Sequence, residues 1–127
     1  MNGLDKVEQN LIDLGVSYQE IAERTWLLDD SNRGLARMAV SVADEIVFFR
    51  TKVMDAPKTK RLEFFEALLR LNAEDLVHGA YGLDDEEVVL TDTLEHATMD
   101  KAEFEAVLDA FGVALSQHYP VLGKYRD

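Results

Sequence analysis

The chain has 127 residues and no cysteine, and 25 acidic against 13 basic residues give it a net charge of −12. Such a length suits one domain, residues 1–127, that can fold without disulfides or metals. The missing cysteines exclude thiolate zinc sites and cysteine nucleophiles. The negative charge argues against nucleic acid and anionic membrane surfaces as partners.

The N-terminal region predicts a short helix and no export signal. The first residues, Met1 to Lys6, lack a basic region followed by an apolar core, and no apolar run approaches the roughly 20 residues that span a bilayer. We therefore expect a cytoplasmic protein. Apolar residues then recur at helical spacing and stop before Gly15, a typical helix terminator: Leu4, Val7, Leu11, Ile12 and Leu14.

Three strands are expected before Pro57, which cannot continue a sheet ladder. Residues 17–23 have mixed character and fit either a strand or a ragged helical turn. The three strands are rich in β-branched and aromatic residues and are separated by turn residues. They are Thr25–Leu28, Leu35–Val42 and Ile46–Met54.

The last two of these strands alternate as half-buried strands do. One face of each is apolar: Ala36, Met38, Val40 and Val42 in the first, and Val47, Phe49, Thr51 and Val53 in the second. Ile46 and Phe48 break the alternation, because they are large and apolar yet share the face of Arg50 and Lys52. They form either a protein-contact spot beside basic side chains or core beneath a helix.

A second helix, two more strands and a third helix follow. The helix spans Leu62–Asn72, with Thr59 as a plausible N-cap. The strands are Leu76–Leu83 and Val88–Leu94, joined by the acidic turn 84–87. Thr98 or Asp100 can cap the last helix, and Glu103 completes a capping-box pattern with Asp100. Pro120 should end or bend this helix near Tyr119.

These elements predict an α+β fold of order α-β-β-β-α-β-β-α. The connections between neighbouring strands are too short for crossovers, so the five-stranded twisted sheet should be mostly antiparallel. The helices should pack mainly on one face of it.

No residues form a recognisable catalytic, metal or cofactor motif. His78, His96 and His118 are far apart in sequence, and none lies at ligand spacing to another metal-binding residue. His78, in a strand beside Gly79, is interpreted as a structural histidine and not as a metal ligand. The acidic run 84–87 lacks the spacing and the glycine of a calcium loop. Gly79 and Gly82 lie in a strand pattern, where glycine marks close packing or a bulge and not a phosphate loop. We expect no cofactor, no metal and no enzymatic activity.

Several stretches resemble the YbjN-type proteins, a bacterial family related to the type III secretion chaperones of the Tir/CesT type. They are Trp26–Leu28, Ile46–Arg50, Leu68–Asn72, His78–Leu83, Val88–Leu90 and the helix from Asp100, within residues 4–119. The resemblance implies this same element order, no catalytic residues and no cofactor. Secretion chaperones are small, acidic and dimeric, and hold client polypeptides in extended form, so a homodimer is expected.

The leading hypothesis is a chaperone-like protein that captures an apolar client segment on a sheet face or edge. Trp26, Ile46 and Phe48 are the candidate protein-binding residues. An alternative is a homodimeric regulator, like the sensory transduction regulators, with a folded protein partner. A third possibility is a small-molecule or enzymatic site in a cavity lined by His78, Tyr81 and a buried carboxylate.

Overall fold

A computed structural model describes residues 3–127, so Met1 and Asn2 of the predicted domain lie outside the described residues. The α+β class and the antiparallel sheet are confirmed. In chain order the elements are α1 (Lys6–Leu14), β1 (Tyr18–Ala22), β2 (Thr25–Asp30), a 3-10 turn η1 (Ser31–Arg33), β3 (Leu35–Ala43), β4 (Ile46–Asp55), α2 (Arg61–Glu74), β5 (Ala80–Asp84), β6 (Glu87–Glu95) and α3 (Lys101–Gly123).

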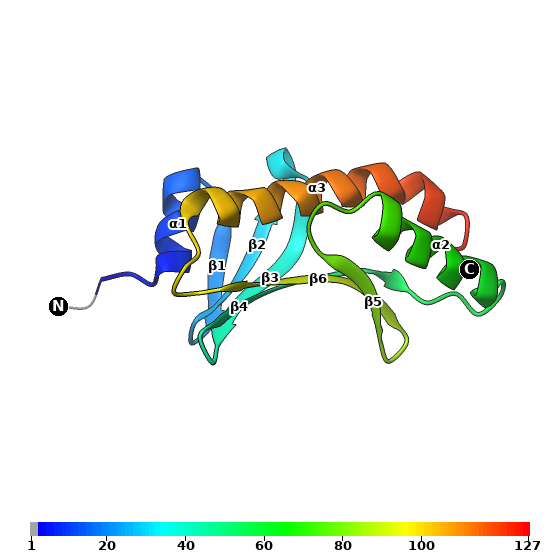
Figure 1. The fold of residues 1–127 in the computed structure, drawn as a ribbon, viewed down its shortest axis with the longest axis horizontal. Coiled ribbons are helices and arrows are strands. Elements are labelled where there is room, and N and C mark those ends of the chain that lie inside the picture. The colour runs from blue at the N-terminus through cyan, green and yellow to red at the C-terminus, as the bar shows by residue number, and fades with distance from the viewer. Residues whose placement is uncertain (1–2) are drawn as a thin grey trace.

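One sheet forms the body of the molecule, in the order β1-β2-β3-β4-β6-β5 with every neighbouring pair antiparallel. The three helices gather on one side of it, and the hairpin ends project away from them (Figure 1). The sheet therefore has one face covered by helices and one open face.

The predicted count of five strands is wrong, because the sheet has six. The additional strand is β1, in the stretch where strand and helix were both possible. Four of its five residues are exposed. It joins the sheet through its main chain at one edge, so its side chains carry no burial pattern from which a strand could be predicted.

The core lies between the covered face and the helices. Phe49 on β4 is 1% exposed, and its ring centroid lies 5.6 Å from that of Phe104 and 6.5 Å from that of Phe111, both on α3. Val7 and Leu11 of α1 extend this core over the first strands. Burial of these side chains between two layers is the main stabilising contribution to the fold.

Two bulges change the predicted faces of β3 and β4. Ala36 is exposed and Leu35 is buried, because Arg37 adopts a φ of 50° where the β2–β3 register shifts. The β4–β6 register likewise shifts between Lys52 and Met54, so that Met54 is buried and Val53 only partly so. An extra residue in one strand reverses the faces of the side chains on one side of it relative to those on the other side.

Helix α1 ends as predicted and is tied down at its start. Gly15 closes it in the left-handed conformation at φ 68°. Asp5 caps its first turn through the Val7 amide. The Lys6 Nζ donates hydrogen bonds to the carbonyls of His96, Ala97 and Met99 at 2.6, 3.2 and 3.1 Å. These bonds attach α1 to the segment that leads into α3.

Helix α2 does not begin at a Thr59 cap. Lys60 precedes the helix in the left-handed conformation at φ 54° and makes no side-chain cap. The segment before the helix bonds the other end of the chain: the Lys58 amide donates to Asp127 Oδ2 at 2.7 Å, and the Thr59 hydroxyl to Asp127 Oδ1 at 3.5 Å. A long-range contact thus replaces the local cap.

The predicted strand Leu76–Leu83 begins four residues too early. Residues 76–79 form a loop, and β5 starts at Ala80. Val77 in this loop is 85% exposed, and Gly79 has a φ of 86°. Leu76 and Val77 are adjacent and apolar, so from the sequence alone they resemble the start of a strand although they lie in a loop.

Helix α3 has the predicted capping box between Asp100 and Glu103, but it does not end at Pro120. It continues to Gly123. Proline has no N–H, so the Ser116 carbonyl, four residues earlier, lacks its helical hydrogen bond. Both Ser116 and Pro120 are exposed, so water can bond this carbonyl instead. Leu122, 2% exposed, anchors the last turn in the core.

Candidate protein-binding surface

The open face of β4 carries the two apolar residues that broke the sequence pattern. Phe48 is 42% exposed and Ile46 is partly exposed, while Val47 and Phe49 between and beside them are buried. Residues two apart on a strand share a face. Ile46 and Phe48 therefore form an apolar spot on the face that no helix covers, and they are not core beneath a helix.

Small side chains lie on both sides of Phe48 in this spot. Phe48 lies opposite Ser41 of β3 and Thr93 of β6, and Ile46 lies opposite Ala43 and Glu95. Cross-strand neighbours are the nearest side chains on a sheet face. Because Ser41 and Thr93 are short, they leave the Phe48 ring within reach of solvent.

Trp26 lies apart from the other two predicted residues. It is 1% exposed and pairs with Val40, which is fully buried. Both belong to the covered face, so the structure brings Ile46 and Phe48 together and places Trp26 in the core. We therefore define the open-face spot by Ile46 and Phe48 without Trp26.

Two apolar residues that the sequence analysis did not select lie on the first two strands. Leu27 is partly exposed, and Ile21 on β1 is 51% exposed. Leu27 pairs with Ala39, which in turn pairs with Arg50 of the open face. The exposure of Leu27 could have been predicted from the sequence: adjacent strand residues point to opposite faces, so Leu27 lies on the open face if Trp26 belongs to the core.

The basic residues beside the spot are paired with acidic groups. The Arg50 guanidinium lies 2.7 Å from Asp84 Oδ2. The Lys52 Nζ lies 2.9 Å from Asp55 and 3.1 Å from Glu87, and hydrogen bonds to these two carboxylates raise the pKa of Lys52. The spot is thus bordered by ion pairs, and a partner would meet an apolar area without a free excess of positive charge.

The two edges of the sheet differ. At β5 the side chain of Asn72 bonds the main chain of Tyr81: the Tyr81 N–H donates to Asn72 Oδ1 at 2.7 Å, and Asn72 Nδ2 donates to the Tyr81 carbonyl at 3.1 Å. Helix α2 thereby occupies this edge. The other edge, β1, has a row of main-chain groups with no neighbouring strand.

The histidines make three separate contacts. His118 is 3% exposed, and its Nδ1 lies 2.7 Å from the Tyr81 hydroxyl. Burial raises the pKa of Tyr81 to about 12. His96 lies 3.2 Å from Asp5, and His78 lies 3.9 Å from Asp92. Tyr81 is therefore joined to His118, and Tyr81 and His78 line two different hollows.

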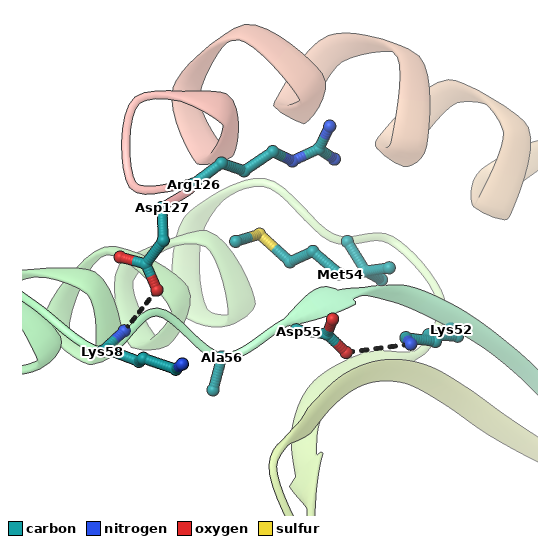
Figure 2. Close-up of a pocket in the computed structure, with 8 residues that line it drawn as sticks. Lys52, Met54, Asp55, Ala56, Lys58, Arg126 and Asp127 are labelled. Atoms are coloured by element: carbon teal, nitrogen blue, oxygen red, sulfur yellow. Dashed lines mark hydrogen bonds and ion pairs between the residues drawn. The ribbon is translucent and has the colours of Figure 1, made fainter.

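The acidic turn and a hollow near the C-terminus are two further places where charged side chains lie close together. Residues 85 and 86 connect β5 to β6, and within residues 3–127 no group of His, Asp and Glu is arranged to hold a metal ion. A hollow of about 550 Å³ lies between the end of β4 and the C-terminus, where Lys52 pairs with Asp55 and the Lys58 amide with Asp127 (Figure 2). None of the described helices combines the length and hydropathy that crossing a bilayer requires.

The sequence matches the profile of the CesT_Tir_1 family over residues 1–127. Among curated proteins, none is similar enough in sequence to count as a match.

Solved structures with this fold include regulators and chaperones. YbjN from E. coli, a proposed transcription regulator, is 18% identical, with 94% of this chain and 93% of that chain covered and a TM-score of 0.70. A chain of the heterodimeric ExoU–SpcU complex, from the type III secretion system of Pseudomonas aeruginosa, is 15% identical (93% and 98% covered, TM-score 0.66). A chain of the HopA1–SchA chaperone–effector complex is 9% identical (95% and 90% covered, TM-score 0.63).

Proposed function

The chain belongs to the CesT_Tir_1 family, and from this premise we propose that it is a non-enzymatic, cytoplasmic, chaperone-like protein that captures a client polypeptide on the open face of its sheet. The observation that carries the proposal is the exposed Phe48 and Ile46 on a sheet face without a helix cover. Similar folds in the ExoU–SpcU and HopA1–SchA complexes support a protein partner.

The client would be an apolar segment in extended form. Its side chains would pack on Phe48, Ile46 and Leu27, where the small neighbours leave room. Strands lie about 4.8 Å apart, so β4 is roughly 14 Å from the β1 edge. A client strand that pairs with β1 therefore cannot also reach Phe48. A client that contacts both the β1 edge and Phe48 must run across the strands of the open face.

An aggregation assay tests this function. We expect the wild-type protein to suppress aggregation of a thermally unfolding model client, and Phe48→Asp with Ile46→Asp to lose that effect while far-UV circular dichroism stays unchanged. Ile12→Asp is the matched control, because Ile12 is 48% exposed on α1, on the helix side. Equal suppression by wild type and the double variant would contradict capture at this spot.

A second candidate is a homodimeric regulator with a folded partner, and the outer side of α2 favours it. Leu62 is 71% exposed and Leu69 is 66% exposed, and residues seven apart lie on one helix face. Glu63 and Arg70 have the same spacing. If two copies paired these helices antiparallel about a two-fold axis, Leu62 would face Leu69 and Glu63 would face Arg70 of the other copy.

Light scattering separates the two candidates. The regulator hypothesis expects a dimer in which Leu62→Asp with Leu69→Asp gives a monomer. It also expects Glu63→Arg and Arg70→Glu each to weaken the dimer and the double exchange to restore it. A dimer that does not affect client aggregation would favour regulation. A monomer at all concentrations would remove the dimer from both hypotheses.

A further inference from the structure

A second apolar groove lies on the helix side of the molecule. It is formed by the loop after α2 and by the outer side of α3, which that loop approaches in Figure 1, and has a volume of about 350 Å³. Val77 on the loop and Val113 on α3 are 85% and 54% exposed. Beside Val113, α3 contributes to the lining the polar side chains of Asp109 and Gln117 and three alanines, Ala106, Ala110 and Ala114. The groove is therefore mainly apolar and is walled by small residues on the α3 side.

Close packing holds the loop against α3. Gly79 ends the loop in the left-handed conformation, at φ 86°. A Cβ at this position would lie 3.0 Å from both the Phe111 ring and the Thr91 carbonyl oxygen. Only glycine allows this approach. The groove is therefore part of the folded structure and does not depend on a partner to form.

A carboxylate that has no lysine or arginine partner among the described residues lines the groove. Asp75 lines the groove, its side chain is 51% exposed, and no Lys or Arg nitrogen of residues 3–127 lies within 4.0 Å of it. Asp109, the other acidic residue of the lining, is already bonded to Arg33 at 3.1 Å. The groove thus has a single carboxylate available to a ligand.

A buried histidine faces this carboxylate. The His118 Nε2 has no hydrogen-bond partner and lies 3.5 Å from Asp75 Oδ2. On the other side of the ring the Tyr81 hydroxyl lies 2.7 Å from Nδ1. The Tyr81 hydroxyl is thus the one hydrogen-bond partner of this ring among the described residues, and Nε2 is left beside Asp75 without a hydrogen bond.

We propose that this groove binds a segment of another polypeptide that presents an aliphatic side chain beside a lysine or arginine. The aliphatic group would pack between Val77 and Val113, and the cation would bond Asp75, so that shape and charge are both matched. The net charge of −12 would speed the encounter with such a basic segment. The groove lies on the opposite side from Phe48, so this partner is independent of the client proposed for the open face.

Fluorescence anisotropy with two labelled nonapeptides tests the proposal. Both contain three leucines, with two lysines in one peptide and two glutamates in the other. We expect only the lysine peptide to bind. Asp75→Asn should weaken it at least about fivefold, and Val113→Lys, which fills the groove and supplies its own cation, should abolish binding. Asp109→Asn removes the same charge from a carboxylate that is already paired, and should change affinity less than twofold.

Amide chemical shifts then locate the bound peptide. Shifts at residues 75–78 and 106–117 support the groove, whereas shifts confined to β1–β4 would overturn it. Equal affinity for the two peptides, or unchanged affinity in both Asp75→Asn and Val113→Lys, would also overturn it. Because both positions are exposed, unchanged far-UV circular dichroism is expected for the variants and separates lost binding from lost folding.

Discussion

The side-chain amide of Asn72 forms a closed pair of hydrogen bonds with the main chain of Tyr81, nine residues later, at 2.7 and 3.1 Å. The amide thus does what a neighbouring strand would do at the β5 edge. Asn72 is the last residue of Leu68–Asn72, one of the stretches that resemble the family. The bond pair gives that asparagine a physical role: it attaches α2 to the sheet and protects the edge from pairing.

Asn72→Ala should therefore destabilise the protein and expose the edge. Two main-chain groups of Tyr81 would lose their partners, at a cost of about 2 to 3 kcal/mol. Urea denaturation measures this loss, and size-exclusion chromatography should show self-association that grows with concentration. Asn72→Asp keeps the acceptor and loses the donor, so its stability should lie between those of the wild-type protein and Asn72→Ala. A stable, unassociated Asn72→Ala protein would show that the pair is dispensable.

Truncation should destabilise the protein much more at Phe49 than at its neighbour Phe48. Phe49→Ala removes a side chain packed on Phe104 and Phe111 and should cost about 3 to 5 kcal/mol. Phe48→Ala removes a 42% exposed side chain and should cost less than about 1 kcal/mol. Chemical denaturation of both variants makes the comparison. Similar losses would mean that the open face is covered in solution.

Gly112→Ala should destabilise the contact between η1 and α3. A Cβ at Gly112 would clash with the Arg33 carbonyl oxygen, which is backbone and cannot rotate away. We expect a loss of about 1 to 3 kcal/mol, seen as a lower Tm in thermal melts. Gly123→Ala is the control, because nothing lies within 4 Å of its added Cβ. Equal Tm values for the two variants would contradict the close approach.

Lowering the pH should destabilise the protein by protonating Asp5, which holds the start of α1 in place. Burial by itself would raise the pKa of Asp5, but hydrogen bonds from the Val7 amide, His96 and Arg24, with the charge of Arg24, outweigh it and hold the pKa below its usual 3.8. A carboxyl with a lowered folded-state pKa stabilises the protein above that usual value, and this stabilisation is lost as the pH falls through the folded pKa.

Urea midpoints at pH 7 and pH 3 measure this effect. The wild-type protein should lose more stability between the two than Asp5→Asn, which has no carboxyl to titrate at this position. Asp13→Asn, at an exposed position of the same helix, should behave like wild type. If Asp5→Asn loses as much stability between pH 7 and pH 3 as the wild-type protein does, another group must be responsible for the pH dependence.

Much of the fold could be predicted from the sequence because it depends on local patterns. The alternation in β3 and β4, the Gly15 stop and the Asp100–Glu103 box each involve residues close in the chain, and each predicted the correct element. The sequence also placed Ile46 and Phe48 opposite Phe49, since strand geometry decides that question without tertiary information.

Tertiary structure alone decided which faces are covered. Trp26 and Phe48 are both aromatic strand residues, yet one is core and the other exposed, because the helices pack on a single side of the sheet. The bonds of Asn72 to Tyr81, the approach of Gly112 to Arg33 and the pairing of β1 join separate segments, so no local pattern encodes them. The sequence by itself determined the elements and their apolar sides, and packing of distant segments decided which apolar side chains remain available to a partner.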